Sequence, residues 1–164
     1  MKKGIWISFL LLFFGAGVFS QKPETRMMKP FTKISVQDRI IAYLESGDVN
    51  EVFLDPKGDA WNEEIKTAVS ESTLDIKSDG RYRDAKIFCF VTYLSEITEL
   101  IARNGGKFIT DSGIIFKGKK LLLDAKIDGF ANMDVSLDEL EISAGSRSDI
   151  YIRGKAKKVI IHAT

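Results

Sequence analysis

The feature that most restricts the fold of this chain is a three-residue unit, apolar, polar, alanine, which recurs in its second half. Successive alanines of the unit lie roughly 20 residues apart, which is about one turn of a repeat protein. In such a protein each unit covers its apolar face only by stacking on the next. The sequence therefore predicts stacked β units in which alanine marks the places where space is short. The units are Leu100-Ile101-Ala102, Leu123-Asp124-Ala125, Ile142-Ser143-Ala144 and Ile161-His162-Ala163.

Small and polar residues follow the first three units and predict sharp turns at a fixed point of each repeat. The turns are Asn104-Gly105-Gly106, Asp128-Gly129 and Gly145-Ser146-Arg147-Ser148. Glycine is suited to such a turn because it adopts positive φ without steric cost. A second short strand is expected after each turn, over residues 107–109, 132–135 and 149–152. Short strands at regular spacing are also typical of a β-sandwich, which remains the alternative fold.

The first half of the chain is also dominated by β patterns, with one exception. Short apolar or alternating runs bounded by turn residues predict strands over 31–36, 39–45, 52–54, 73–77 and 87–93. In the segment 60–70, by contrast, Trp61, Ile65, Ala68 and Val69 are spaced as on one face of a helix. We therefore predict one short helix there, packed on the sheet.

The N-terminus has the order of a secretory signal, with two lysines, an apolar run over 5–14 and small residues before Gln21. We expect cleavage after Ser20, a polar linker over 21–30 and one domain over 31–164. A membrane anchor is the alternative, but spanning a bilayer takes roughly 17–25 apolar residues. The sequence thus predicts export to the periplasm, the outer-membrane surface or the extracellular space, with no membrane-spanning segment after signal removal.

Composition argues against several classes of function. Lys and Arg number 24 against 23 Asp and Glu, so no basic excess points to nucleic acid. The only cysteine, Cys89, lies in an apolar run and is expected to be a small buried hydrophobic residue. The only histidine, His162, lies far from it in the sequence. Because a nucleophile needs a neighbouring base and zinc sites draw on several His and Cys ligands, we predict no catalytic residue, metal or cofactor.

The carboxylates and the glycine-rich turns raise two further possible functions, glycoside hydrolysis and calcium binding. Glycosidases need only a pair of carboxyl groups, and calcium is bound in the turns of some β repeats. No fixed spacing selects an acidic pair here, and neither the turn at Asn104 nor the turn at Asp128 continues into the full calcium pattern. A solvated acidic face is therefore the expected interpretation. The carboxylates that fall in neighbouring units are Asp124, Asp128, Asp134 and Asp138.

Two kinds of surface segment are candidates for ligand contact. Arg81-Tyr82-Arg83 places an aromatic ring between two cations, a combination that can stack on a sugar and pair with an acidic group. The lysine pairs Lys119-Lys120 and Lys157-Lys158 each precede the apolar strand of a unit. Stacking would bring these pairs to one edge as a basic patch for acidic polysaccharide. The alternative is that the lysines only protect strand edges from aggregation.

From residue 31 onward the sequence resembles the head GIN domain of autotransporter adhesins, a family of exported proteins. The resemblance rests on the order of the opening strand 31–36, the hairpin through 41–48, the strands 74–77 and 87–93, and the alanine-ending units. It implies a right-handed, stacked-coil β-solenoid or β-roll-like domain, all-β apart from the short helix. No enzymatic activity and no cofactor are attached to the family.

The resemblance implies a non-catalytic surface or envelope protein with adhesin-like binding, whose partner is a surface polysaccharide or an envelope protein. A periplasmic structural or sensing module is the alternative, and a carbohydrate-active enzyme on a β-solenoid is the third interpretation. Members of the family usually carry further coils, so this sequence is expected to be a divergent short member or a C-terminally truncated one. Residues 159–161 would then form an unpaired edge strand, which predicts self-association.

Overall fold

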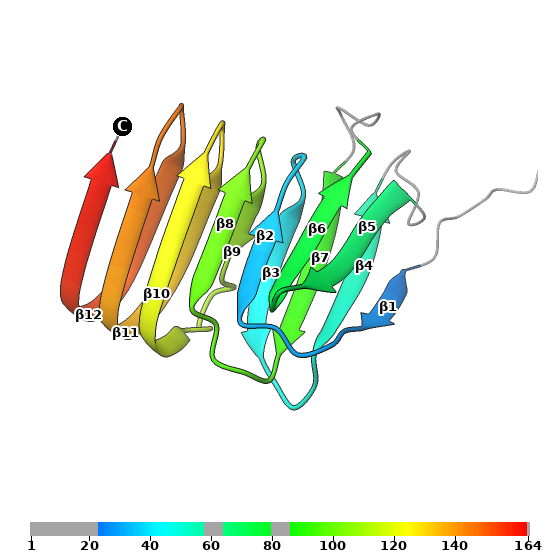
Figure 1. Cartoon of the computed structure of the whole chain (residues 1–164), viewed down its shortest axis with the longest axis horizontal. Coiled ribbons are helices and arrows are strands. Elements are labelled where there is room, and N and C mark those ends of the chain that lie inside the picture. The colour runs from blue at the N-terminus through cyan, green and yellow to red at the C-terminus, as the bar shows by residue number, and fades with distance from the viewer. Residues whose placement is uncertain (1–22, 58–63, 80–85, 164) are drawn as a thin grey trace, which may run out of the picture.

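The computed structural model describes residues 23–57, 64–79 and 86–163 (Figure 1). The predicted signal sequence over 1–20 and residues 60–63 of the predicted helix lie outside this part of the chain. The described residues form twelve strands and almost no helix, which confirms the all-β class. No helix among them is long and apolar enough to cross a membrane. The strands are β1 (Glu24–Met27), β2 (Lys33–Val36), β3 (Ile41–Ser46), β4 (Glu51–Lys57), β5 (Ile65–Ser70), β6 (Thr73–Ser78), β7 (Lys86–Tyr93), β8 (Glu99–Arg103), β9 (Lys107–Ile109), β10 (Phe116–Lys126), β11 (Phe130–Ala144) and β12 (Asp149–Ala163).

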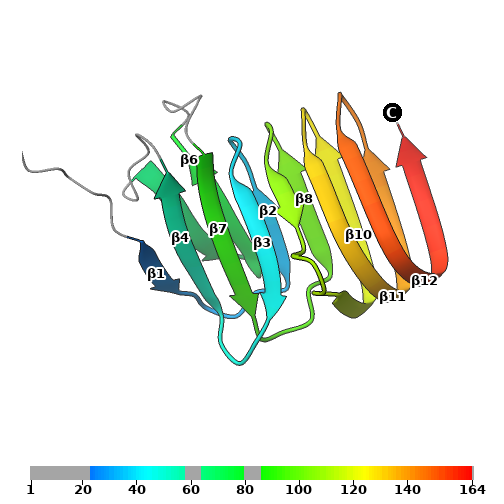
Figure 2. The same cartoon turned by 180° about the vertical axis from the view of Figure 1, so that it is seen from behind.

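The strands make one curled, open sheet whose two halves face each other. The order is β1-β4-β7-β3-β9-β11-β10-β8-β2-β6-β5, and β12 pairs with β11. Figure 1 shows β8, β2 and β6 in front of β9, β3 and β7, and Figure 2 shows the same layers from behind. We call the layer that holds β8, β2 and β6 the first layer, and the layer that holds β3, β7 and β4 the second layer. The long strand β11 belongs to both, because its start pairs with β9 and its end with β10.

Pairing within the described part of the sheet is mostly parallel. Eight strand pairs are parallel, and three are antiparallel, namely β1–β4, β4–β7 and β5–β6. The antiparallel pairs lie at the two ends of the strand order, which the curl of the sheet brings to one end of the molecule (Figure 1). The sandwich alternative predicts antiparallel neighbours, which occur only at that end. The register also brings the alanines of the recurring unit into one row, since Ala125 pairs with Ala102 and with Ala144, and Ala144 pairs with Ala163.

Sharp two-residue turns carry the chain from the first layer to the second. In each described turn two consecutive residues have positive φ: Asp38-Arg39, Asn104-Gly105, Ile127-Asp128 and Ser146-Arg147. The turns are hydrogen-bonded to one another, as the Gly105 amide donates to the Ile127 carbonyl at 3.0 Å and the Asp128 amide to the Ser146 carbonyl at 3.1 Å. The glycine- and serine-containing segments therefore do form the predicted turns.

Alternate side chains of both layers point into one shared apolar core. Ile34, Leu74 and Leu123 enter from the first layer, and Leu44 and Phe108 from the second; all are buried. Alternation arises because successive side chains of a strand point to opposite faces. The core is therefore lined by the apolar positions of every strand pair, and the remaining positions form two outer faces.

Cys89 lies inside this core on β7 and is fully buried. Burial raises the pKa of its thiol to about 12, so the group stays neutral and unreactive across ordinary pH. The prediction that Cys89 is a small buried hydrophobic residue is confirmed.

The predicted helix over 60–70 is wrong for its described part, because Ile65–Ser70 is strand β5. This strand forms an antiparallel hairpin with β6 through Glu71 and Ser72, both of which have positive φ. Such a turn is the kind that matches the twist of paired strands. The apolar residues of a short segment fit both periods, and pairing with the neighbouring strand decides between them.

The segment 21–30, expected to be a polar linker, contains strand β1. It pairs antiparallel with β4, with Arg26 opposite Val52. Its side chains alternate between half-buried and exposed, and none is fully buried. Three of its four residues are polar, so the sequence lacks the apolar alternation by which a strand is recognised. An edge strand of this kind is held by backbone pairing rather than by core contacts.

Candidate binding face

The outer side of the second layer carries aromatic side chains where a solvated sheet usually carries polar ones. They occupy alternate positions of the strands, between the buried residues that face the core. We call this surface the aromatic face and define it by Tyr43, Phe53, Phe88, Phe90, Phe130 and Tyr151. The register places Tyr43 beside Phe90 and Phe90 beside Phe53, so β3, β7 and β4 present a continuous row.

Rings in the centre of the aromatic face pack against one another. The centroids of Tyr43 and Phe90 are 5.1 Å apart with planes at 15°, and those of Tyr43 and Phe88 are 6.3 Å apart at 26°. Phe53 tilts against Phe90 at 5.9 Å. Such offset and tilted contacts hold the rings in fixed positions. Phe90 nevertheless remains 39% exposed, so the row is both ordered and open to solvent.

A second aromatic pair lies further along the same face, on β11 and β12. The ring centroids of Phe130 and Tyr151 are 5.8 Å apart, and Lys107 Nζ lies 5.4 Å from the Phe130 centroid. Register places Ile41 and Ile109 between this pair and the central row, since Ile41 pairs with Lys107 and Ile109 with Tyr43. Apolar side chains therefore occur on every strand of this layer, with Lys107 and Asn132 between the two aromatic groups. Exposed apolar surface of this kind is typical of an interaction site.

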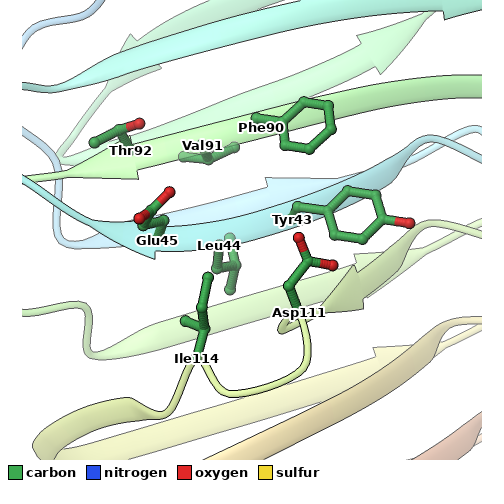
Figure 3. Close-up of a pocket in the computed structure, with 8 residues that line it drawn as sticks. All are labelled: Tyr43, Leu44, Glu45, Phe90, Val91, Thr92, Asp111 and Ile114. Atoms are coloured by element: carbon green, nitrogen blue, oxygen red, sulfur yellow. The ribbon is translucent and has the colours of Figure 1, made fainter.

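A shallow depression lies at the edge of the central row (Figure 3). It encloses about 260 Å³ of empty space, part of which is open solvent. Tyr43, Phe90 and Thr92 line one part of it, and the carboxylates of Glu45 and Asp111 lie close by (Figure 3). Exposed carboxylates accept hydrogen bonds from hydroxyl or ammonium groups. The depression therefore combines ring surface with hydrogen-bond acceptors, and its remaining lining residues are Leu44, Val91 and Ile114.

The outer side of the first layer carries charges, and it brings the two predicted lysine pairs together. Lys120 and Lys158 flank Glu139, with Nζ to carboxylate distances of 2.7 and 3.1 Å. Lys157 pairs with Asp138 at 2.7 Å, and the Lys119 amide donates to the Glu96 carboxylate. Stacking therefore places Lys120 and Lys158 on the two sides of one carboxylate. Acidic side chains from β11 lie between them and offset their charge.

The other predicted contact segment, Arg81-Tyr82-Arg83, lies outside the described residues. The aromatic face was missed by sequence reasoning, although a signal was present. In the run Phe88-Cys89-Phe90 the buried position is the cysteine, and both rings point outward. A nearly continuous apolar run such as 87–93 is typical of a strand buried on both sides, and it is also what an apolar outer face produces.

The four aspartates considered for catalysis are each paired with a cation. The closest oxygen–nitrogen distances are 3.1 Å for Asp124 to Lys126, 2.8 Å for Asp128 to Arg147, 2.7 Å for Asp134 to Arg153 and 2.7 Å for Asp138 to Lys157. Burial alone would raise the pKa of Asp124, but hydrogen bonds from Lys126 and Arg103 outweigh it and lower the pKa. The hydrogen bond from Arg153 lowers the pKa of Asp134.

A general acid needs the opposite shift, because it must keep its proton near neutral pH. Asp124 and Asp134 are therefore arranged as ion-pair partners rather than as general acids, and Asp128 and Asp138 also pair with cations. Within the described ranges, no group of three or more His, Cys, Asp or Glu side chains is placed to hold a metal ion.

Comparison with known proteins places the chain in a family. The model of the family described as "putative auto-transporter adhesin, head GIN domain" matches residues 30–164. The chain belongs to this family. The resemblance drawn from the order of strands and units is thereby confirmed. A search among curated proteins found no match.

Several solved structures share the fold of this GIN domain. A putative adhesin from Bacteroides fragilis is 19% identical with a TM-score of 0.73, and the match covers 88% of this chain and 68% of that one. A putative adhesin from Parabacteroides distasonis is 14% identical with a TM-score of 0.73, covering 87% and 61%. A putative lipid binding protein from the same species is 16% identical with a TM-score of 0.54, covering 86% and 72%. At these identities the likeness shows the fold alone.

Proposed function

We propose that this GIN domain is an exported, non-catalytic binding module of adhesin type, and that it contacts surface polysaccharide through the aromatic face. The observation that carries the proposal is the ordered row of Tyr43, Phe90 and Phe53, whose rings pack together while Phe90 stays exposed. A solvated sheet gains nothing from exposing such rings, whereas a binding surface uses rigid aromatic contact area. Family membership supports the adhesin type of role.

The chemistry of the depression favours a neutral or amine-bearing sugar. The apolar C–H face of a sugar ring packs on aromatic side chains, and its hydroxyl or amino groups donate to carboxylates. Glu45 and Asp111 supply acceptors beside Tyr43 and Phe90. An acidic polysaccharide fits less well, because Lys120, Lys157 and Lys158 already have acidic partners on β11.

The test of the ligand is binding to an array of immobilised polysaccharides, with neutral, amino-sugar and acidic members. We expect the native chain to bind neutral or amino-sugar members, and Tyr43→Ser/Phe90→Ser to lose at least tenfold in affinity. Leu94→Ser is the matched control, because Leu94 is an exposed apolar residue that does not line the depression. Equal binding by the double variant and the native chain would contradict the proposal, as would binding of acidic members alone.

The test of location is protease accessibility of the tagged protein on intact cells, with a periplasmic protein scored in the same samples. An adhesin-type role requires digestion while the periplasmic protein stays intact. Protection until the outer membrane is opened would favour the periplasmic structural or sensing module instead.

For the fold, we propose a right-handed β-solenoid whose C-terminal coils are equal in length. Its support is the register, because Ala125 pairs with Ala144 and Ala144 with Ala163, at the same separation in the sequence. The stacked turns between the layers add to that support, since they repeat at the same point of each coil. The coil repeat is tested by extending the domain with further coils of the same length.

A further inference from the structure

The last described strand, β12, presents a row of cations that is matched to the strand before it. Each of four cations on the coil that includes β12 contacts a carboxylate at the corresponding position of the preceding coil. The nitrogen–oxygen distances are 2.7 to 3.1 Å. The pairs are Arg147 with Asp128, Arg153 with Asp134, Lys157 with Asp138, and Lys158 with Glu139.

Charge alternates from strand to strand in this part of the sheet. Lys120 on β10 contacts Glu139 on β11, and Glu139 contacts Lys158 on β12. The order is therefore cation, acid, cation. Opposite charges on directly adjacent strands stabilise a sheet, and like charges destabilise it. The next position after β12 thus favours an acidic side chain.

The apolar column of the core is uncovered at the same strand. Val159 and Ile161 are 52% and 65% exposed, whereas their register partners Leu140 and Ile142 are 2% and 8% exposed. Ile152 is only partly buried against the core. In the described structure β12 pairs with β11 alone, so its other edge offers fifteen residues of backbone for pairing.

We propose that this edge receives an acidic parallel β-strand, with carboxylates opposite the cations of β12 and apolar side chains over Val159 and Ile161. The coil containing β11 is an example of such a strand, because its carboxylates already pair with the cations of the β12 coil from the opposite side. These carboxylates belong to Asp128, Asp134, Asp138 and Glu139. Backbone hydrogen bonds would supply affinity, and the acidic row would select the partner and its register.

A second copy of this chain fits the edge less well. Two β12 edges placed together would bring cation rows face to face. At the opposite end of the sheet, the carboxylate of Glu24 in β1 is engaged by Arg26 at 2.9 Å, and β5 carries Lys66 with no acidic residue. No described edge of a second copy supplies an acidic row. The sequence predicts self-association through an unpaired edge strand over 159–161. The charges at the described edges do not favour that pairing.

The experiment measures binding of synthetic peptides to the full chain by fluorescence anisotropy. The probe is a labelled peptide with the sequence of residues 126–144, which contains five carboxylates and remains soluble. The matched control peptide carries Lys in place of the four carboxylates that contact Arg147, Arg153, Lys157 and Lys158. We expect the acidic peptide to bind with at least tenfold higher affinity than the Lys peptide, and to protect the amides of residues 149–163 from hydrogen exchange. Raising the salt concentration should narrow the difference.

Variants of the chain assign the binding to the edge. Arg153→Gln/Lys158→Gln should weaken binding of the acidic peptide several-fold, and Ile161→Lys should weaken binding of both peptides. Circular dichroism and thermal melting confirm that each variant is folded. Equal affinity for the two peptides, absence of binding to the folded chain, or a dimer of the chain with protected β12 amides would each overturn the proposal. The last outcome would show that a second copy is the occupant.

Discussion

At the scale of single residues, the turn glycines are set by close backbone approach. A Cβ atom added at Gly106 would lie 2.1 Å from the Val36 carbonyl oxygen. Backbone cannot move away as a side chain can, so Gly106→Ala should destabilise the fold by about 1–3 kcal/mol. Urea unfolding measures the loss. Gly118→Ala is the control, because its nearest contact is the flexible end of Glu96 at 3.3 Å. Equal stability of the two variants would contradict the assigned close approach.

The ion pairs between strands predict how stability depends on pH. Hydrogen bonds from Lys120 and then Lys158 lower the pKa of Glu139 below its usual 4.5. A lowered pKa in the folded state stabilises the protein above the unfolded pKa, and this contribution is lost as pH falls through the folded value. The urea midpoint of the native chain should therefore exceed that of Glu139→Gln at pH 7, and the two should converge below pH of about 4.

Salt provides the control for this prediction. At 1 M salt the Debye length falls to roughly 3 Å, so the difference at pH 7 should shrink. A difference that stayed constant from pH 7 to pH 3 would show that Glu139 acts through packing and not through its charge.

Residue identity predicted the buried thiol and the turns, but not the aromatic face. Cys89 lies among apolar neighbours in the sequence, and that is enough to bury it. Whether Phe88 and Phe90 or Cys89 face the core depends on the register with β3 and β4, which the run itself does not encode. The sequence also did not show whether carboxylates offset the charge of Lys157 and Lys158, because their acidic partners on β11 lie one coil away in the sequence.

At the scale of secondary-structure elements, the alanine row sets how closely the neighbouring strands and the opposite layer pack. Ala125 is fully buried and pairs with Ala102 and Ala144. Ala125→Leu should cost about 1–3 kcal/mol, because the extra side chain must force the core apart. Ala163→Leu is a matched control at the exposed end of the same row, expected to change stability by less than about 0.5 kcal/mol. Chemical denaturation of both variants decides the point, and equal losses would mean that the row is not space-limited.

Strand positions were predicted best where apolar residues alternate and the segment is bounded by turn residues. The strand over 73–77 meets both conditions, and the structure places β6 there. The segment 87–93 is apolar almost throughout and follows a polar loop, and β7 lies there. The apolar residues of Ile65–Ser70 fit the helical period as well as the strand period, and the hairpin with β6 decides its conformation. Glu24–Met27 carries almost no apolar signal and depends on its pairing with β4.

At the scale of the whole molecule, the two outer faces differ in chemistry. The second layer exposes rings around Tyr43 and Phe90, whereas the first layer exposes ion pairs around Glu139. The polysaccharide proposed for the first of these surfaces and the acidic strand proposed for the β12 edge therefore address different parts of the domain. The two sites meet at Tyr151 on β12, but Tyr43 and Phe90 lie on β3 and β7 and make no contact with Arg153 or Lys158. Substitutions at Tyr43 and Phe90 should therefore leave binding of the acidic peptide unchanged.

A stacked-coil architecture also predicts how the domain can be extended. In a repeat protein each coil contacts only its neighbours, so further coils should be accepted when they fit the preceding one. Appending a second copy of residues 126–163 after Ala163 would place an acidic coil on the cationic β12 and continue the alternation. We expect this variant to fold, to keep or raise the melting temperature, and to protect the β12 amides from hydrogen exchange.

The matched control inserts a second copy of residues 126–144 between Ala144 and Gly145, which places one acidic coil on another. Glu139 would then face its own copy instead of Lys158. Like charges on adjacent strands should lower the melting temperature relative to the first variant, and added salt should recover part of the loss. If both extensions unfolded the domain, the constant register would be a local feature of β10, β11 and β12, and the solenoid proposal would fail. If both were equally stable, the alternation of charge would not select what stacks on β12.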